Sequence, residues 1–435
     1  MKKVHHFILF FVVMLALQAV SKDVCAQNES PKQVVQGDVF DLFLSKEKRA
    51  RLHEEVVTIK PFKLYISAFP FVGYNPALGF VVGGTFNPAV YLGDIRNTPI
   101  SAFAVNVNFT TRSQMLLSVR SSIFTSNADM FLKGDWRFYL FSQPTYGLGS
   151  DITGTDTSRW IMHSGDLCYS VNDVAEPMKF DYIRLYETIN KRIVGRFYLG
   201  VGYHLDWFLN ITDEYQNPES KPERVSQHYL YSEKYGFNPE KYSASGLVFS
   251  ILYDSRDNSI RPVKGIYACL VPRFNLDMLG STKNSVSLNA EFRTYIGLSK
   301  RNPAHLIAFW YQSQFLLDGK LGYLNLPAVG WDTYGRTGRG YVQGRIRGVN
   351  YIYGEVEYRF PISRYTRILS GVVFTNASTT DSDMKSVRLF EYIAPSVGAG
   401  LRVMLNKRSL SNLTIDMGFG LNGSKGVFLN VSETF

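Results

Sequence analysis

Histidine and carboxylate side chains are the groups of this 435-residue chain whose spacing could support hydrolytic chemistry. His204 and Asp206 are two residues apart, so on a β-strand both side chains would point to the same face. Such a pair could act as a base and its orienting acid. However, the chain has no Gly-x-Ser-x-Gly, His-Glu-x-x-His, phosphate-loop or Gly-x-Gly-x-x-Gly motif. We therefore interpret the pair as polar lining of a protein interior, and we predict no enzymatic activity and no cofactor.

Cysteine spacing and charge exclude other kinds of site. Cys25, Cys168 and Cys269 are too far apart in the sequence to suggest a disulfide framework or a metal site. The net charge of +10 is scattered along the chain rather than gathered in one basic segment. We therefore expect no metal and no nucleic-acid partner.

A charged hinge separates two alternating strands in the middle of the chain. In the first strand Leu247, Phe249, Ile251 and Tyr253 fall on one face, as on a sheet whose outer side meets an apolar medium. The polar residues that follow are Asp254, Ser255, Arg256, Asp257 and Asn258, and Pro262 and Gly265 close the hinge. A charged turn of this kind is typical of the periplasmic side of an outer-membrane β-barrel.

The same alternation continues along most of the chain. Aromatic residues make up 14% of it, while the mean hydropathy is near zero. A barrel combines these values because apolar outward residues alternate with polar inward ones. The predicted strands are 62–72, 78–91, 98–110, 113–125, 127–141, 177–190, 193–212, 244–254, 264–275, 285–297, 304–317, 350–361, 366–376, 393–406, 410–421 and 425–435. The prediction is an all-β, transmembrane antiparallel β-barrel of about sixteen strands; a soluble β-sandwich or propeller is the alternative.

The connections between these strands alternate in length. The long ones, 142–176, 213–243, 318–349 and 377–392, fall on the extracellular side if the chain starts in the periplasm, and short turns fall on the other side. In strand 350–361, Glu355, Glu357 and Arg359 lie on one face and Ile352 and Val356 on the other. Because charge on the lipid face is costly, the charged face must point into the barrel.

Both ends of the chain carry export features. Lys2 and Lys3 precede an apolar run from Phe7 to Leu17, which is too short for a membrane-spanning helix and predicts a cleaved signal peptide over 1–26. Residues 27–61 would form a short periplasmic segment, either a helix over 38–56 or an unstructured lead, and 62–435 the barrel. The last strand, from Gly426 to Phe435, ends in an aromatic residue, as in the C-terminal signal of barrel proteins. These features predict the bacterial outer membrane.

Three motifs in this order resemble the barrel domain of the BamA/TamA family, also called the bacterial surface antigen family. They are the hinge at 254–265, Arg339-Gly340-Tyr341 in the long loop before strand 350–361, and Glu357-Tyr358-Arg359-Phe360-Pro361. The resemblance covers about 62–435. It implies that the loop folds into the lumen and that Arg339 pairs with Glu357, although Arg347 in the same loop could be the equivalent arginine.

The chain departs from this family in two places. The family has an aspartate in the strand after Glu357, but Asn376 stands in the corresponding stretch. The family's periplasmic polypeptide-transport-associated (POTRA) domains have no room in 27–61. The second departure bears on whether the barrel could insert proteins without further subunits.

Three functions remain open from the sequence. The resemblance implies a barrel that assists insertion, assembly or translocation of outer-membrane proteins as part of a complex, with lipids, client proteins and accessory subunits as partners. A passive pore and a surface-exposed scaffold are the alternatives.

Overall fold

The computed structural model describes residues 37–39, 41, 60–75, 79–152, 161–164, 167–170, 175–220, 223–299, 302–363, 367–407, 410–431 and 433–435. The chain divides into two compact units, residues 1–35 and 36–435, and the first lies outside the described residues. The predicted signal peptide and nearly all of the predicted helix over 38–56 therefore lie outside them too. All of the described strands and helices belong to the second unit.

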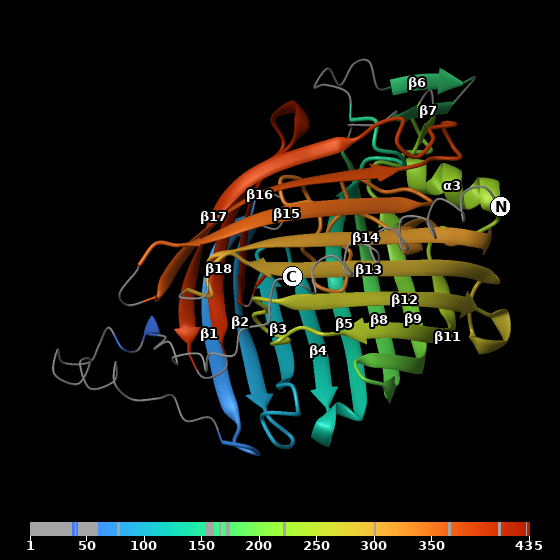
Figure 1. The fold of residues 1–435 in the computed structure, drawn as a ribbon. Coiled ribbons are helices and arrows are strands. Elements are labelled where there is room, and N and C mark those ends of the chain that lie inside the picture. Colours follow the sequence, from blue (N-terminus) through green and yellow to red (C-terminus); the bar gives the residue numbers. More distant parts are fainter. Residues whose placement is uncertain are drawn as a thin grey trace. The chain divides into compact units, whose positions relative to one another are not determined.

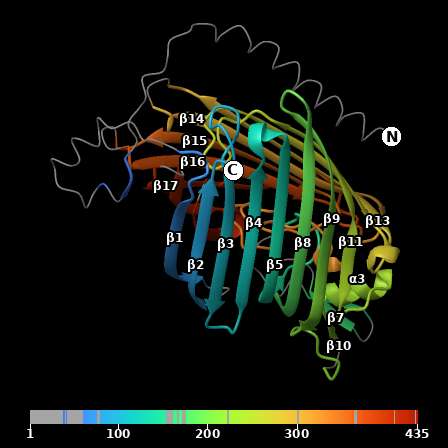
Figure 2. The same cartoon turned by 90° about the horizontal axis from the view of Figure 1, so that it is seen from below.

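One antiparallel sheet of sixteen strands forms the body of this unit (Figure 1). Each strand pairs with its neighbour in chain order, and Figure 2 shows this succession from β1 to β13. The strands are β1 (Tyr65–Asn75), β2 (Gly79–Val90), β3 (Ser101–Thr110), β4 (Met115–Phe124), β5 (Met130–Thr145), β8 (Glu176–Val194), β9 (Phe197–Asp213), β11 (Tyr242–Asp254), β12 (Gly265–Asn275), β13 (Ser285–Gly297), β14 (Leu306–Gly319), β15 (Tyr351–Pro361), β16 (Leu369–Thr380), β17 (Ala394–Asn406), β18 (Ser411–Phe419) and β19 (Lys425–Val431).

The predicted barrel of about sixteen strands is confirmed, and every predicted strand overlaps one strand of the sheet. Several of the predicted bounds were wrong by three or four residues, among them the first and the last. The first strand begins at Tyr65 rather than residue 62, and the last ends at Val431 rather than Phe435. The last residues leave the sheet because their side chains pack inside the barrel, where Phe435 is buried.

Smaller elements occur in the connections between the strands of the large sheet. A three-stranded sheet is formed by β6 (Ile161–Ser164), β7 (Leu167–Ser170) and β10 (Glu223–Val225), and α3 spans Gln227–Tyr235. The 3-10 helices are η3 (Ser126–Ala128), η5 (Asp277–Leu279), η6 (Tyr323–Asn325) and η7 (Leu421–Gly423). Helix α3 starts where the Ser226 side chain accepts a hydrogen bond from the Tyr229 amide, and it ends at Gly236 in the left-handed conformation.

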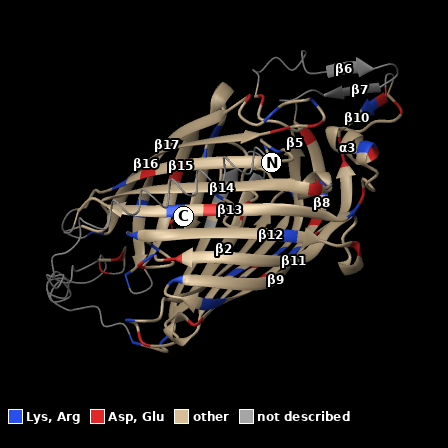
Figure 3. Ribbon diagram, turned by 45° about the vertical axis from the view of Figure 1, so that its right-hand side comes forward, with Lys and Arg blue, Asp and Glu red and all other residues tan. Residues whose placement is uncertain are grey.

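The two faces of the strands differ as the alternation predicts. Val356 and Tyr358 of β15 are about 40% exposed on the outside, whereas Glu355 and Glu357 between them are buried inside. Strands β13 to β15 are uncharged over most of their length in Figure 3, and charged positions are more frequent near strand ends and in the connections. Among the described residues, no helix has the length and apolar character needed to cross a membrane.

Strands β1 and β19 are the two ends of the sheet, and each has one paired neighbour among the described strands. Strand β1 lies near the C-terminal strands, because the Asn406 side chain at the end of β17 donates a hydrogen bond to the Ile66 carbonyl of β1 at 3.4 Å. Figure 1 likewise places β1 beside β17 and β18. We call the boundary between β1 and β19 the seam.

Candidate functional site

The connection between β14 and β15, residues 320–350, folds into the barrel, and we call it the lumen loop. Its backbone is held by its own hydrogen bonds, including Val329 N to Ile346 O at 2.9 Å. Tyr323, Tyr341 and Arg347 of this loop are all less than 2% exposed. The loop can be buried because its backbone N–H and C=O groups form hydrogen bonds within the loop, and buried backbone groups require such partners.

Arg339 lies at the centre of a buried cluster of carboxylates from two strands. Its Nη1 donates to Asp416 Oδ2 at 2.7 Å, and its Nη2 donates to Glu355 Oε1 at 2.5 Å and also to Glu357 Oε1. The guanidinium is centred 3.6 Å from the ring of Phe374. Fixed carboxylates around a planar fork of donors form the strongest class of ion pair in a protein interior.

Three further arginines balance the charge of this cluster. Arg402 pairs with Asp416 at 2.5 Å and with Glu433 at 3.0 Å, and Arg359 pairs with Glu357 at 2.6 Å. Arg261 of the hinge lies 3.9 Å from Glu433. The carboxylates are Glu355, Glu357, Asp416 and Glu433, so that four acids face four arginines. We call these eight residues the lumen ion network.

Glycines let the lumen loop approach the wall of the barrel. Gly340 has a φ of +122°, and a Cβ there would lie 2.6 Å from Ser396 Cβ of β17. A Cβ on Gly418 of β18 would lie 2.7 Å from the Gly340 amide nitrogen. The Tyr341 hydroxyl then donates to the Pro395 carbonyl at 2.6 Å and accepts from the Leu421 amide at 3.0 Å. The Arg339-Gly340-Tyr341 tripeptide is therefore fixed against β17 and β18 by side chain and backbone together.

An earlier part of the lumen loop, residues 331–333, is attached to the N-terminal strands. Arg137 of β5 donates to the carbonyl oxygens of Asp332 and Thr333, both at 2.8 Å. The Trp331 ring donates to the Gln143 side chain of β5 at 3.1 Å. The lumen loop thus bridges the two walls that meet at the seam, one through Arg137 and the other through Arg339.

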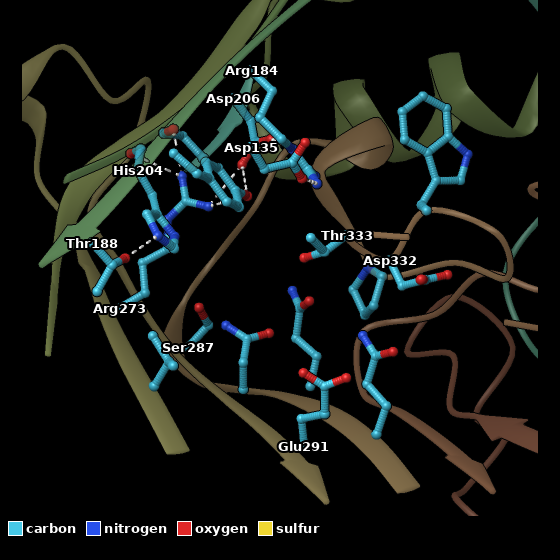
Figure 4. Close-up of a pocket in the computed structure, with 18 of the residues that line it drawn as sticks. Asp135, Arg184, Thr188, His204, Asp206, Arg273, Ser287, Glu291, Asp332 and Thr333 are labelled. Carbon is cyan, nitrogen blue, oxygen red and sulfur yellow. Dashed lines mark hydrogen bonds and ion pairs between the residues drawn. The ribbon is translucent and has the colours of Figure 1, made fainter. Parts of the chain in front are cut away.

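Arg137 belongs to a second charged network around a lumen cavity of about 180 Å³. Asp135 pairs with Arg137 at 2.8 Å and with Arg184 at 3.2 Å, and Asp206 pairs with Arg184 at 3.0 Å and Arg273 at 2.7 Å. Figure 4 shows Asp135, Arg184, Asp206 and Arg273 around the cavity, together with Ser287 and Glu291 of β13.

His204 and Asp206, the pair with possible hydrolytic spacing, lie in this second network. His204 Nε2 is 3.2 Å from the Thr188 hydroxyl, while Asp206 is engaged by arginines. On the extracellular side, His228 lies 2.7 Å from Asp213 and 3.5 Å from Ser232 Oγ. Ser232 and His228 are fully buried, so a substrate cannot reach them in this structure. We interpret the contacts of His204 and Asp206, and those of His228 with Asp213 and Ser232, as structural hydrogen bonds.

The predicted hinge residues form a connection between β11 and β12 that is held by several hydrogen bonds of its own. Arg256 pairs with Asp254 at 2.7 Å, and Asn258 Oδ1 accepts from the amides of Ile260 and Arg261 at 2.8 and 2.9 Å. Asp257 Oδ1 similarly accepts from the amides of residues 263 and 264 at 3.0 and 3.3 Å. Pro262 lies inside the turn so formed. Gly265 ends it with a φ of +103°, where a Cβ would lie 2.3 Å from the Ser255 carbonyl oxygen.

The chain end lies inside the barrel rather than on β19. Phe435 is 4% exposed, and its ring centroid lies 5.2 Å from that of Trp310 and 5.4 Å from the Arg359 guanidinium. Gly426 stays in β19 and pairs with Gly418. The structure therefore separates these two residues, which the sequence grouped as one signal.

Sequence reasoning missed two members of the lumen ion network as partners of Arg339. Glu355 was signalled by its position two residues before Glu357 on the same strand face. Asp416 occupies an inward position on β18, 77 residues from Arg339. It supplies the acid that is missing at Asn376, whose side chain instead donates to the Arg339 carbonyl at 3.1 Å. Arg347 serves the lumen loop itself, because it donates to the carbonyls of Tyr323, Leu324 and Leu326.

Comparison with known proteins places this architecture in a family. No match was found among curated protein sequences. Two solved structures are similar to the chain. BamA from Haemophilus ducreyi lacking POTRA domains 1-3 has a TM-score of 0.48 and 14% identity, covering 85% of this chain and 69% of that chain. CdiB from Acinetobacter baumannii has a TM-score of 0.47 and 11% identity, covering 85% of this chain and 59% of that chain, so this chain spans about three fifths of CdiB. The Omp85 superfamily domain matches residues 190–426, more than half of the chain, and the chain therefore belongs to the Omp85 superfamily of bacterial outer-membrane barrels.

Proposed function

We propose that this barrel assists the insertion, assembly or translocation of other proteins at the outer membrane, as a subunit of a larger complex. The observation that carries the proposal is the combination of an unpaired seam with a lumen loop anchored on both of its sides. Membership of the Omp85 superfamily supports the same general role. The involvement of client proteins and of accessory subunits is part of this proposal.

The seam supplies the chemistry for receiving a strand. An edge strand carries backbone N–H and C=O groups that can pair with an incoming strand. In this barrel β1 and β19 offer such edges next to the lipid, where any unpaired backbone group is costly. A client strand that pairs with either edge therefore gains hydrogen bonds that the lipid cannot provide.

The lumen loop would hold the two edges at a fixed separation. Arg339 attaches it to β15 and β18, while Arg137 attaches it to β5. Because these contacts are buried and charge-assisted, they favour one geometry strongly over others. Arg339, Gly340, Tyr341 and Glu357 are accordingly proposed as positioning residues for the seam, and the 254–265 hinge as a rigid periplasmic turn.

The decisive experiment is quantitative proteomics of the outer-membrane fraction after depletion of this protein. We expect a broad fall in other barrels or surface lipoproteins, with their precursors accumulating in the periplasm. Wild-type protein supplied in trans should restore the profile, and an Arg339→Ala variant should restore it poorly. An unchanged proteome after depletion would overturn the proposal.

A passive pore is the second candidate, because the 180 Å³ lumen cavity is lined by many polar side chains. This function requires measurable conductance of the wild-type barrel in planar bilayers. Steady channels together with an unchanged proteome would favour the pore over a role in assembly.

A further inference from the structure

A second cavity lies at the seam itself and has no part in the proposed role in assembly. Its volume is about 250 Å³, and it is bounded by β1 to β5 on one side, by β18 and β19 on the other, and by the lumen loop. The lining residues that matter are Phe69, Asn108, Arg120, Arg336, Leu429 and Asn430. We call it the seam cavity.

Two arginines in the seam cavity lack the carboxylate partners that the other lumen arginines have. Arg120 donates to the carbonyl oxygens of Thr333 and Tyr334, at 3.5 and 3.4 Å, and its guanidinium lies 5.8 Å from the centroid of the Tyr334 ring. Arg336 donates to the Val431 carbonyl at 3.3 Å, and its Nε has no hydrogen-bond partner among the described residues. Within the described part of the chain, neither guanidinium forms an ion pair.

The carboxylates nearby are already engaged. Asp332 Oδ1 accepts hydrogen bonds from the amides of Arg336 and Thr337 and from the Thr337 hydroxyl. Glu433 belongs to the lumen ion network and pairs with Arg402. Asp135, opposite Arg120 across β4 and β5, is shared by Arg137 and Arg184. The seam cavity therefore holds the buried guanidinium of Arg336 and the half-buried guanidinium of Arg120, neither of them in an ion pair among the described residues, an arrangement that favours the entry of an anion.

The cavity wall also becomes apolar toward the membrane. Arg120 and Asn108 face inward, and Asn430 of β19 pairs with Thr414, which is buried. Leu429, the neighbour of Asn430, alternates to the outer face and is 46% exposed. An anionic head held at the arginines would thus have an apolar path between the strand edges, past Leu429, toward the lipid.

We propose that the seam cavity binds a phosphate-class oxyanion, held by Arg120 and Arg336, whose source is the head group of an anionic phospholipid or free phosphate. Two guanidiniums offer the planar donor pairs that phosphate oxygens accept bidentately. The apolar path toward the membrane would allow a phospholipid to place its head group in the cavity. The polar lumen would allow free phosphate to reach the same arginines. This binding is independent of any role in protein assembly.

The test is native mass spectrometry of the purified full-length barrel with phosphatidylglycerol or phosphatidylcholine added to the detergent. We expect a tight phosphatidylglycerol adduct in the wild type and about tenfold weaker binding in the Arg120→Gln, Arg336→Gln double variant. Arg112→Gln is the matched control, because Arg112 is exposed in the turn between β3 and β4. Unchanged heat-dependent gel mobility would show that each variant is folded.

Competition with inorganic phosphate separates the two sources. Displacement of the lipid by phosphate would identify a site open to free anions, and resistance to displacement would identify a head-group site. If the double Gln variant does not fold, the Arg120→Lys, Arg336→Lys variant keeps the charge and should still bind, more weakly. Equal binding of phosphatidylcholine and phosphatidylglycerol by the wild type would overturn the proposal, as would undiminished binding by the folded double Gln variant.

Discussion

Replacing Arg339 by methionine removes one charge from the lumen ion network while keeping most of the side-chain volume over Phe374. Four carboxylates would then face three guanidiniums in a region where Arg339, Glu355 and Glu357 are each 2% exposed or less. Breaking a buried ion pair on one side typically costs about 3–5 kcal/mol, because the remaining charge is uncompensated. We expect the Arg339→Met barrel to lose about 3–5 kcal/mol of unfolding free energy.

The assay is urea unfolding of the folded barrel in lipid vesicles, followed by tryptophan fluorescence and by heat-dependent gel mobility. Glu355→Gln made in the Arg339→Met background restores the balance of charges, so the double variant should lose less stability than the two single variants added together. Arg96→Met is the control, because Arg96 pairs with Asp94 at an exposed site and its loss should have no measurable effect. Strict additivity of the two buried substitutions, or a loss for Arg339→Met below about 1 kcal/mol, would refute the electrostatic reasoning.

Three further predictions concern the lumen loop and its surroundings. Gly340→Ala should displace the loop from Ser396, at a cost of about 1–3 kcal/mol, because of the positive φ and the 2.6 Å approach, and faster cleavage of the loop by protease would show it. Arg137→Met should release the loop from β5 and raise single-channel conductance, and conductance equal to wild type would contradict the anchoring role. Burial lowers the pKa of the Lys385 amine, in the connection between β16 and β17, from 10.5 to about 8, although Asp151 at 3.9 Å opposes the shift. Since only the neutral amine is acylated, modification of Lys385 followed by mass spectrometry should be half-maximal near pH 8, and a midpoint near the ordinary value would show that burial does not act on it.

The sequence predicted the wall of the barrel far better than its contents. Period-two alternation shows which residues of a strand face inward, so Glu355, Glu357 and Asp416 could all be assigned to the interior. The pattern contains no information on which strand lies opposite another across the lumen. The contact of Arg339 with Asp416 could therefore not be predicted from the sequence, although the pairing of Arg339 with Glu357 was expected from the resemblance to a family.

Irregular segments were missed for a different reason. Helix α3 and the small sheet of β6, β7 and β10 lie in long connections whose residues show no sustained period. The end of the chain was misassigned because Phe435 keeps the spacing of the outward positions Leu429 and Val431, although Glu433, between Val431 and Phe435, is charged. In the structure, burial against Arg402 and Trp310 overrides the pairing that would have extended the strand.

The contacts of the lumen loop with the N-terminal strands also constrain the order in which the barrel can fold. Arg120 and Thr333 are 213 residues apart in the chain, and Arg137 and Asp332 are 195 apart. Contacts of such long range form slowly, because the intervening chain must first be ordered. The lumen loop cannot settle until both the first five strands and the strands after β14 are in place. Its docking is therefore a late event in folding, and a chain halted before that event would have its strands formed and its interior still open to water.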